Sequence, residues 1–205
     1  MTEELLTSFI KRPDLKKIYS LINNNWRVLD LGCGDGRLLE GLAKDKQVHG
    51  VGVEVSQNKI IQCIKNGVNV IQGDLNKPLM FKNCHFDAVI LSQTLQAVDR
   101  PDLLLDEMLR VGDRALISFI NFSYIGNRLQ LLFKGKMPKS SALPFEWYDS
   151  PNIHFGTIKD FRILCKEKNI KIISETPLGK RTHLLPKLCP NLFAAICVFE
   201  ITKNN

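Results

Sequence analysis

The segment from Arg27 to Gly36, which reads Arg-Val-Leu-Asp-Leu-Gly-Cys-Gly-Asp-Gly, constrains the fold of this chain more than any other stretch. A short apolar run ends in three closely spaced glycines, and a helical pattern of apolar residues starts directly after them. This order predicts a strand, a tight turn and the start of a helix. Glycines let a ligand approach the backbone closely, and the first N–H groups of the helix point toward it. The segment therefore predicts a ligand-binding turn, with an ordinary strand-to-helix connection as the alternative.

The spacing of these glycines argues against two common nucleotide-binding motifs. The third glycine comes one residue too early for the dinucleotide pattern G-x-G-x-x-G, and no Gly-Lys-Ser/Thr follows as in a P-loop. The segment instead resembles motif I of the class I S-adenosylmethionine-dependent methyltransferases, in which an acidic residue precedes G-x-G-x-G. The matching residues are Asp30, Gly32, Gly34 and Gly36. The resemblance implies that this turn, including Cys33 and Asp35, contacts the methionine part of S-adenosylmethionine or of its product S-adenosylhomocysteine.

A glutamate lies at the end of the second predicted strand, residues 48–55. Glu54 comes about twenty residues after the glycine turn, where an acidic residue meets the ribose hydroxyls in nucleotide-type sites. Its carboxylate can accept two hydrogen bonds from a cis-diol. The plain alternative is a surface glutamate at a strand end. We expect a ribose beside Glu54 and Val55.

Polar residues also follow the third and fourth predicted strands, at residues 69–72 and 86–91. In the methyltransferases a carboxylate after the third strand accepts a hydrogen bond from the adenine amino group, and Asp74 occupies that position. The resemblance implies that the adenine and the sulfonium lie near these strand ends. The residues concerned are Gly73, Asp74 and Leu75 for the adenine, and Ser92 and Gln93 for the sulfonium.

The pattern of elements along the 205 residues predicts one α/β domain. Four strand-then-helix units and a fifth strand at residues 114–121 imply a parallel sheet covered by helices on both faces. Residues 171–176 and 192–202 form a last strand pair with only a loop between them, which favours an antiparallel hairpin at one edge. The predicted fold is a single doubly wound, mostly parallel seven-stranded sheet, Rossmann-like as in the methyltransferases, with residues 1–25 as a helical lead-in.

Several helix ends carry residues whose side chains or backbone suit that position. Asp14 is expected to cap the first helix, and Ser56 the helix that follows the second strand. Thr157 and Asp160 have the spacing of a capping box, and Gly67 is expected to end a helix in the left-handed conformation.

Residues 122–156 are too long for a simple connection, and we call them the insert. Because they follow a predicted parallel strand, they are expected to lie over the ligand crevice as a lid or substrate wall. Tyr148 and His154 are candidates for catalysis, but Trp147 and Tyr148 can equally pack the insert onto the sheet, and His154 can be a hydrogen-bonded structural residue. The basic residues of the insert form either a solvated face or a docking site for an acidic partner or anionic substrate. They are Arg128, Lys134, Lys136 and Lys139.

Composition narrows the class of protein further. The net charge of +7 raises the question of nucleic acid, but the basic residues are spread along helix faces without a nucleic-acid-binding signature, so we expect none. The six cysteines include no C-x-x-C pair, and most lie in apolar patterns, which favours reduced thiols and no metal site. The sequence shows no secretory signal and no apolar run long enough for a membrane span, so a cytoplasmic protein without membrane contact is expected.

Three longer runs resemble one family more specifically. Residues 91–98, 128–132 and 147–154 read Leu-Ser-Gln-Thr-Leu-Gln-Ala-Val, Arg-Leu-Gln-Leu-Leu and Trp-Tyr-Asp-Ser-Pro-Asn-Ile-His. All three look like the MetW family of methionine biosynthesis proteins, and the resemblance covers nearly the whole chain from Arg27 onward. It implies a role in methionine biosynthesis together with homoserine O-acyltransferase.

Two functions are compatible with these observations. The first is a methyltransferase that acts on a small cytoplasmic metabolite beneath the insert. The chain reads Ser-Gln-Thr-Leu after the fourth strand instead of Asn/Asp-Pro-Pro-Tyr, which argues against methylation of DNA adenine or of glutamine. The second is a non-catalytic or regulatory partner of homoserine O-acyltransferase that binds S-adenosylmethionine as a feedback signal.

Overall fold

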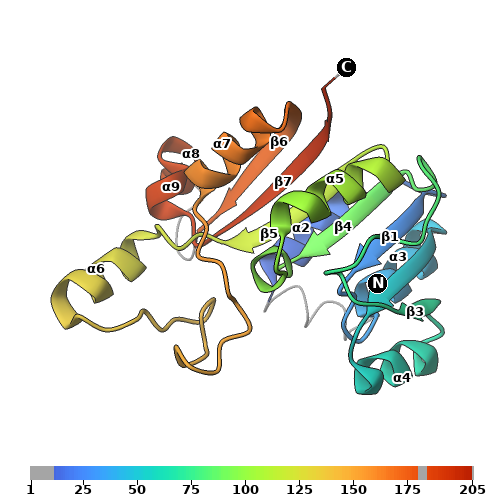
Figure 1. Cartoon of the computed structure of the whole chain (residues 1–205), viewed down its shortest axis with the longest axis horizontal. Helices are drawn as coiled ribbons and strands as arrows, with labels where there is room; N and C mark the ends of the chain where they lie inside the picture. The colour runs from blue at the N-terminus through green and yellow to red at the C-terminus, as the bar shows by residue number, and fades with distance from the viewer. Residues whose placement is uncertain (1–11, 180–183, 205) are drawn as a thin grey trace.

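The computed structural model describes residues 12–179 and 184–204, which form a seven-stranded sheet in the order β3-β2-β1-β4-β5-β7-β6 (Figure 1). Strands β1 to β5 pair in parallel, and β7 pairs antiparallel with both β5 and β6. The predicted doubly wound, mostly parallel sheet with an antiparallel C-terminal hairpin is therefore confirmed. The strands are β1 Arg27–Leu31, β2 His49–Glu54, β3 Val70–Gln72, β4 Ala88–Ser92, β5 Ala115–Ile120, β6 Ile170–Leu178 and β7 Ile196–Lys203.

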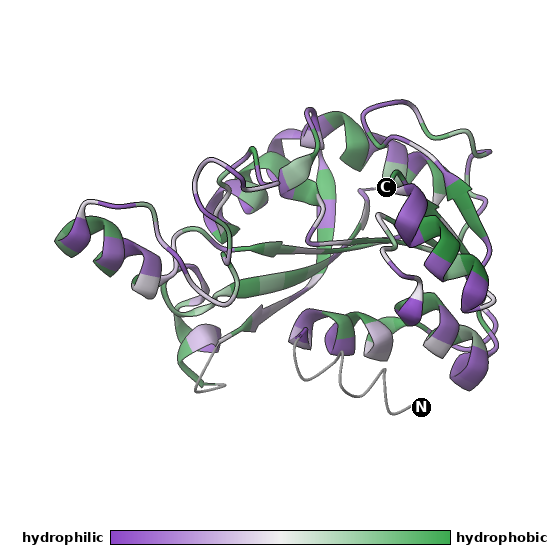
Figure 2. Ribbon diagram, turned by 90° about the horizontal axis from the view of Figure 1, so that it is seen from below, coloured by the Kyte–Doolittle hydropathy of each residue, from purple (hydrophilic) through white to green (hydrophobic). Residues whose placement is uncertain are grey.

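Helices cover the sheet on both faces, with their apolar sides turned inward (Figure 2). Helices α2 and α3 share one buried apolar cluster, whereas α5 and α7 share the other. The central strand β5 is buried along its whole length, as expected for a strand covered on both faces. The helices are α2 Pro13–Leu21, α3 Arg37–Lys46, α4 Gln57–Lys65, α5 Pro101–Val111, α6 Ile125–Lys134, α7 Ile158–Glu167, α8 Leu184–Leu188 and α9 Pro190–Phe193, with a 3₁₀ turn, η1, at Leu95–Ala97.

Two parts of the predicted element order are wrong. The last strand begins at Ile196, not at residue 192, because Pro190 at the first helical position starts the short helix α9. Two short helices therefore stand where only a loop was expected between the last two strands. In addition, β3 and β4 are joined without a helix, so three crossovers contain an α-helix instead of four.

The capping predictions have mixed outcomes. The Thr157 and Asp160 capping box is formed at the start of α7, and Gly67 has a φ of +70° after α4. Ser56 lies at the N-cap of α4, but its side chain makes no capping hydrogen bond. Asp14 does not cap α2 either, because Arg12 is the N-cap residue and the Asp14 carboxylate turns into the protein.

The two ends of the insert lie side by side. The N–H of Phe122 donates to the carbonyl of Gly156 at 3.1 Å, and the rings of Phe122 and Phe155 lie 4.9 Å apart. Between these ends, α6 projects from the sheet beyond β5 (Figure 1). Among the residues of α6, Asn127 alone is buried.

Candidate functional site

The predicted ligand-binding positions gather at the carboxyl edge of the sheet. Strand order reverses between β1 and β4, and in open α/β sheets ligands bind at such a switch point, outside the carboxyl ends of the strands. The glycine turn follows β1, and Glu54 and Ser92 are the last residues of β2 and β4. Because these strands are parallel, segments far apart in the sequence meet at this edge.

The glycine turn holds its three glycines in the left-handed conformation, with φ values of +73°, +62° and +79° at Gly32, Gly34 and Gly36. A Cβ atom at Gly32 would lie 2.8 Å from Oγ1 of Thr94, so this glycine allows the turn to pack against the loop after β4. A Cβ atom at Gly34 would meet no atom within 4 Å. Gly34 therefore presents open backbone, which is the side from which a ligand can approach.

Glu54 holds this turn through hydrogen bonds to backbone N–H groups. Its carboxylate is almost fully buried, and Oε2 accepts a hydrogen bond from the N–H of Gly34 at 3.0 Å. The other oxygen, Oε1, accepts from the N–H groups of Val55 and Ser56, both at 3.0 Å. A carboxylate has about four acceptor sites, so three are used and one on Oε2 is left among the described contacts. Glu54 thus orders the turn in addition to its expected role toward a ribose.

The residues after β3 present an exposed carboxylate at the same edge. Oδ1 of Asp74 accepts from the N–H of Asn76 at 3.0 Å, which fixes its side chain in a local turn. The N–H of Gly73 donates to the carbonyl of Glu54 at 3.1 Å and ties this segment to β2. Leu75 packs against the core, whereas Val55 is exposed.

Asp30 lies at the base of the glycine turn and is buried. Burial raises the pKa of its carboxyl to about 7, with Arg12 opposing the rise and Glu54 adding to it. Burial therefore favours the neutral form of this carboxyl group.

Cys33 and Cys63 connect the turn to α4. Their Sγ atoms lie 3.8 Å apart, and the Cys63 thiol donates to the carbonyl of Gly34 at 3.2 Å. Burial raises the pKa of both thiols above the ordinary range. Both cysteines are free thiols.

Three polar residues at this edge were not predicted from the sequence. Arg12 and Ser118 form a network with Asp14 and Ser92, and Asp14 is fully buried. Gln96 is also buried and joins the loop after β4 to other segments. Ser118 could have been found, because a serine within the otherwise apolar run Ala-Leu-Ile-Ser-Phe-Ile needs a buried hydrogen-bond partner.

Gln96 links the base of the insert to the edge of the sheet. Its Oε1 accepts from the N–H of Ile120 at 3.1 Å, and its Nε2 donates to the carbonyl of His154 at 3.1 Å. Its own carbonyl accepts from the N–H groups of Ile153 and His154. The His154 ring nitrogen Nε2 lies 3.2 Å from the carbonyl of Asp99, which supports the structural interpretation of this histidine.

The aromatic pair of the insert does not pack onto the sheet. Trp147 and Tyr148 are 75% and 72% exposed, and their rings contact each other edge to face. A cavity of about 580 Å³ lies within the insert, and none of the predicted cofactor positions lines it. Its lining includes Phe122, Met137 and Phe155, so it is a pocket of the insert and not part of the crevice at the strand ends.

Two further findings concern residues 12–179 and 184–204. In that part of the chain, no group of three or more His, Cys, Asp or Glu side chains is arranged to hold a metal ion. None of the helices within residues 12–179 and 184–204 combines the length and apolar character that a membrane span needs.

The fold is shared with solved methyltransferase structures. An S-adenosylmethionine-dependent methyltransferase from Archaeoglobus fulgidus matches the structure with a TM-score of 0.71 at 17% identity, covering 96% of this chain and 94% of its own. At this identity the likeness shows the fold, which is the Rossmann-like methyltransferase fold.

The family follows from the sequence comparisons. The family model described as "Methionine biosynthesis protein MetW" matches residues 12–201. The bifunctional methionine biosynthesis protein MetXA/MetW of Rhodopirellula baltica is 37% identical over 204 residues, which cover 94% of this chain and 33% of that protein. The chain therefore belongs to the MetW family.

A more distant similarity links the chain to a methyltransferase of known reaction class. The mitochondrial ubiquinone biosynthesis O-methyltransferase of Saccharomyces cerevisiae is 28% identical over 154 residues, which cover 66% of this chain and 46% of that protein. The chain thus spans less than half the length of either of these two relatives.

Proposed function

We propose that this chain binds S-adenosylmethionine at the carboxyl edge of the sheet and transfers its methyl group to a small metabolite in methionine biosynthesis. The open backbone at Gly34, held in place by Glu54, is the observation that carries the proposal. The residues present fit the ligand, since the glycine turn offers close approach, Glu54 retains one acceptor site and Asp74 presents an exposed carboxylate.

The chain's own residues would bind and orient the two reactants. When bound, S-adenosylmethionine supplies a methyl group on a sulfonium, and its transfer requires close and collinear approach of a nucleophile. The glycine turn would hold the methionine part, Glu54 the ribose and Asp74 the adenine. The insert would supply the acceptor side, with Tyr148 and His154 as its candidates for contact with the acceptor.

Calorimetric titration with S-adenosylmethionine and S-adenosylhomocysteine tests the binding site. We expect Glu54→Ala to weaken both ligands by about tenfold or more, since a charge-assisted hydrogen bond contributes about 1.5–3 kcal/mol. Glu54→Gln, which keeps one of the two acceptor oxygens, should weaken them less. Glu40→Ala is the control, because Glu40 pairs with Lys44 on α3. If the unaltered protein binds neither ligand, the proposed function is wrong.

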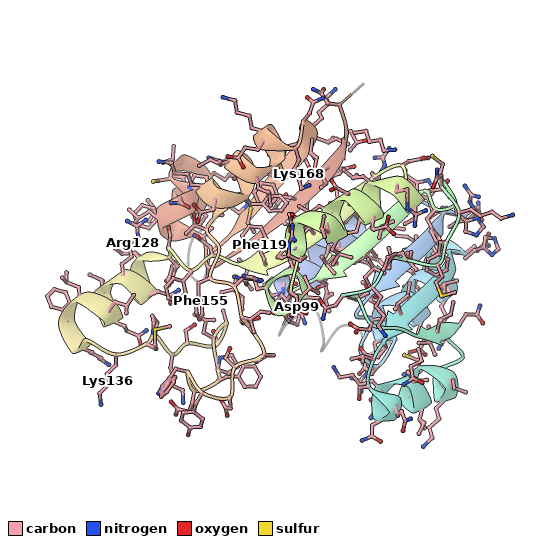
Figure 3. The ribbon with its side chains drawn as sticks, viewed as in Figure 1. Asp99, Phe119, Arg128, Lys136, Phe155 and Lys168 are labelled. Carbon is pink, nitrogen blue, oxygen red and sulfur yellow. The ribbon has the colours of Figure 1, made fainter. Side chains whose placement is uncertain are left out.

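A second function is supported by the fused relative, whose name joins MetXA and MetW in one chain. In this alternative the chain is a regulatory partner of homoserine O-acyltransferase, and the insert is its docking surface. Leu132 and Phe133 on α6 are 74% and 78% exposed, next to Lys134 and Lys136. Figure 3 shows Arg128 and Lys136 on this projecting part of the molecule.

The choice of variants for this alternative follows from the hydrogen bonds of α6. Arg128 donates to the carbonyl and the hydroxyl of Ser123 at 2.7 and 2.8 Å, so its replacement would disturb the start of the helix. The pair Lys134→Glu and Lys136→Glu should release homoserine O-acyltransferase in a pull-down while S-adenosylmethionine affinity stays unchanged. Lys166→Glu with Lys171→Glu is the control, because both lysines are exposed outside the insert. Equal retention of the acyltransferase by both pairs would exclude this docking surface.

A further inference from the structure

The insert contains a hollow of its own, away from the ends of the parallel strands. Its volume is about 580 Å³, within the range of about 300–1,000 Å³ that is typical of small-molecule sites. None of the predicted cofactor positions lines it, so a ligand bound there would leave the glycine turn and Glu54 free. We call this hollow the insert cavity.

Contacts within the insert hold the walls of this cavity in place. Gly135 ends α6 with a φ of +57°, and the chain then passes back beside the helix, where the side chain of Gln130 makes two hydrogen bonds of 3.1 Å with the backbone of Lys139. Lys139 also forms an ion pair with Glu146 on the following segment. The cavity therefore lies between segments that are tied together by the insert's own contacts.

Aromatic side chains form much of the lining. Phe145 and Trp147 belong to the segment between α6 and α7, and Phe155 lies where the insert returns to the sheet (Figure 3). These three side chains are 48%, 75% and 51% exposed, so a flat ligand in the cavity would cover apolar surface that is otherwise in contact with water. The neighbouring Tyr148 is as exposed as Trp147 but does not line the cavity.

The charges around the insert cavity favour an anion. Its lining contains three charged side chains, of which Lys139 and Glu146 pair with each other. The third is Lys136, and within residues 12–179 and 184–204 no ion pair is found for it. Aromatic walls alone would also suit a cation, but a cation would be repelled by this unpaired ammonium group. An aromatic ring that carries a carboxylate matches both the walls and the charge.

We propose that the insert cavity is a second ligand site and that it takes an aromatic carboxylate, with the ring against Trp147 and Phe155 and the carboxylate beside Lys136. The site is separate from the one proposed for S-adenosylmethionine, and the inference does not depend on that function. The alternative is a solvent-filled gap between loops that binds no ligand.

Calorimetric titration with three probes of similar shape tests the proposal. 2-Naphthoate carries a carboxylate, 2-naphthamide is its neutral counterpart, and 2-naphthylmethylammonium carries the opposite charge. We expect saturable binding of 2-naphthoate with a Kd of about 1 mM or tighter, as for a small ligand of modest efficiency. Binding of 2-naphthamide should be about two- to fivefold weaker, as for the loss of an exposed ion pair, and that of the ammonium probe weaker still. Absence of saturable 2-naphthoate binding, or equal or tighter binding of the ammonium probe, would overturn the proposal.

Two matched pairs of variants locate the binding. Lys136→Met should remove the preference for the carboxylate, whereas Lys134→Met, which replaces an equally exposed lysine outside the lining, should keep it. Trp147→Ala should weaken 2-naphthoate and 2-naphthamide alike by about two- to tenfold, whereas Tyr148→Ala should change neither. All four side chains are exposed, so these variants should fold. The proposal is wrong if the two members of either pair behave alike.

A competition experiment separates the insert cavity from the strand ends. Saturating S-adenosylhomocysteine should change the affinity for 2-naphthoate by less than about twofold, because none of the predicted cofactor positions lines the cavity. Loss of 2-naphthoate binding in its presence would place the probe at the strand ends and overturn the second site. If S-adenosylhomocysteine itself does not bind, the proposed function fails, while the titrations with the three probes still decide whether the second site exists.

Discussion

Replacing Gln96 by methionine should weaken the attachment of the insert to the sheet without creating a cavity, because the two side chains have similar volumes. Gln96→Met removes the two side-chain hydrogen bonds that join Ile120 of β5 to His154 at the end of the insert. The N–H of Ile120 is buried, so the loss of its acceptor is expected to be the larger part of the cost.

The expected loss can be worked out from these two bonds. A buried donor left without an acceptor costs about 1–3 kcal/mol, and the more accessible carbonyl of His154 adds about 0.5–1 kcal/mol, so we expect a loss of about 1.5–4 kcal/mol in the free energy of unfolding. For a chain of this length each kcal/mol lowers the melting temperature by about 2–4 °C, which gives a decrease of about 3–16 °C.

Gln130→Met is the matched control for this prediction. The side chain of Gln130 also makes two hydrogen bonds, both to the backbone of Lys139, but they are exposed to solvent. Its replacement should therefore change stability by less than about 0.5 kcal/mol. Urea unfolding and thermal melting of the two variants measure the difference. Equal stabilities would refute the claim that Gln96 ties the insert to the sheet.

Three other predictions concern the site and the cysteines. The folded protein holds the Asp30 proton up to about pH 7, whereas the unfolded chain releases it near pH 4, so stability from this residue is present below pH 4 and lost as the pH rises to 7. Asp30→Asn should flatten that slope and, in urea unfolding at pH 8, stabilise the fold by on the order of 4 kcal/mol; an unchanged slope would contradict the assignment. Gly32→Ala should lower the melting temperature more than Gly34→Ala, because only its Cβ meets Thr94, whereas Gly34→Ala should weaken S-adenosylmethionine more in calorimetry. A thiol reagent should modify the exposed Cys84 and Cys189 quickly and the four buried cysteines only on unfolding; more than two fast thiols would be inconsistent with the packing.

Most of the fold could be predicted from local patterns. The five parallel strands were found because β1 to β5 are short apolar runs that end at glycine or polar residues, and β1 was placed at its observed bounds. The start of β7 could not be placed, because the run from residue 192 is apolar and can be read as either strand or helix. Pro190 at the start of α9 and the packing of α9 against α7 favour the helix at this place.

The sequence predicted those parts of the candidate site that depend on local backbone conformation. It did not predict the parts that depend on contacts between residues far apart in the sequence. Three positive φ values in one turn follow from the glycines themselves. By contrast, the tetrapeptide Arg-Pro-Asp-Leu occurs at residues 12–15 and again at residues 100–103. Asp14 in the first copy is buried and accepts from Ser118, which is 104 residues away in the sequence, whereas Asp102 in the second copy is 32% exposed. No local signal distinguishes the two copies, so only the polar residue within the apolar strand β5 could have indicated the difference.

The hydrogen bond between the two ends of the insert affects how the length and sequence of this segment can change in evolution. Because Phe122 and Gly156 are already joined by a backbone hydrogen bond, the exposed outer part of the insert can be lengthened, shortened or exchanged without moving β5 or α7. Loop-closure entropy rises slowly with loop length, so the thermodynamic cost of such changes is small. Evolution can therefore alter the molecule's outer recognition surface through this one segment while the strand ends and the glycine turn stay as they are.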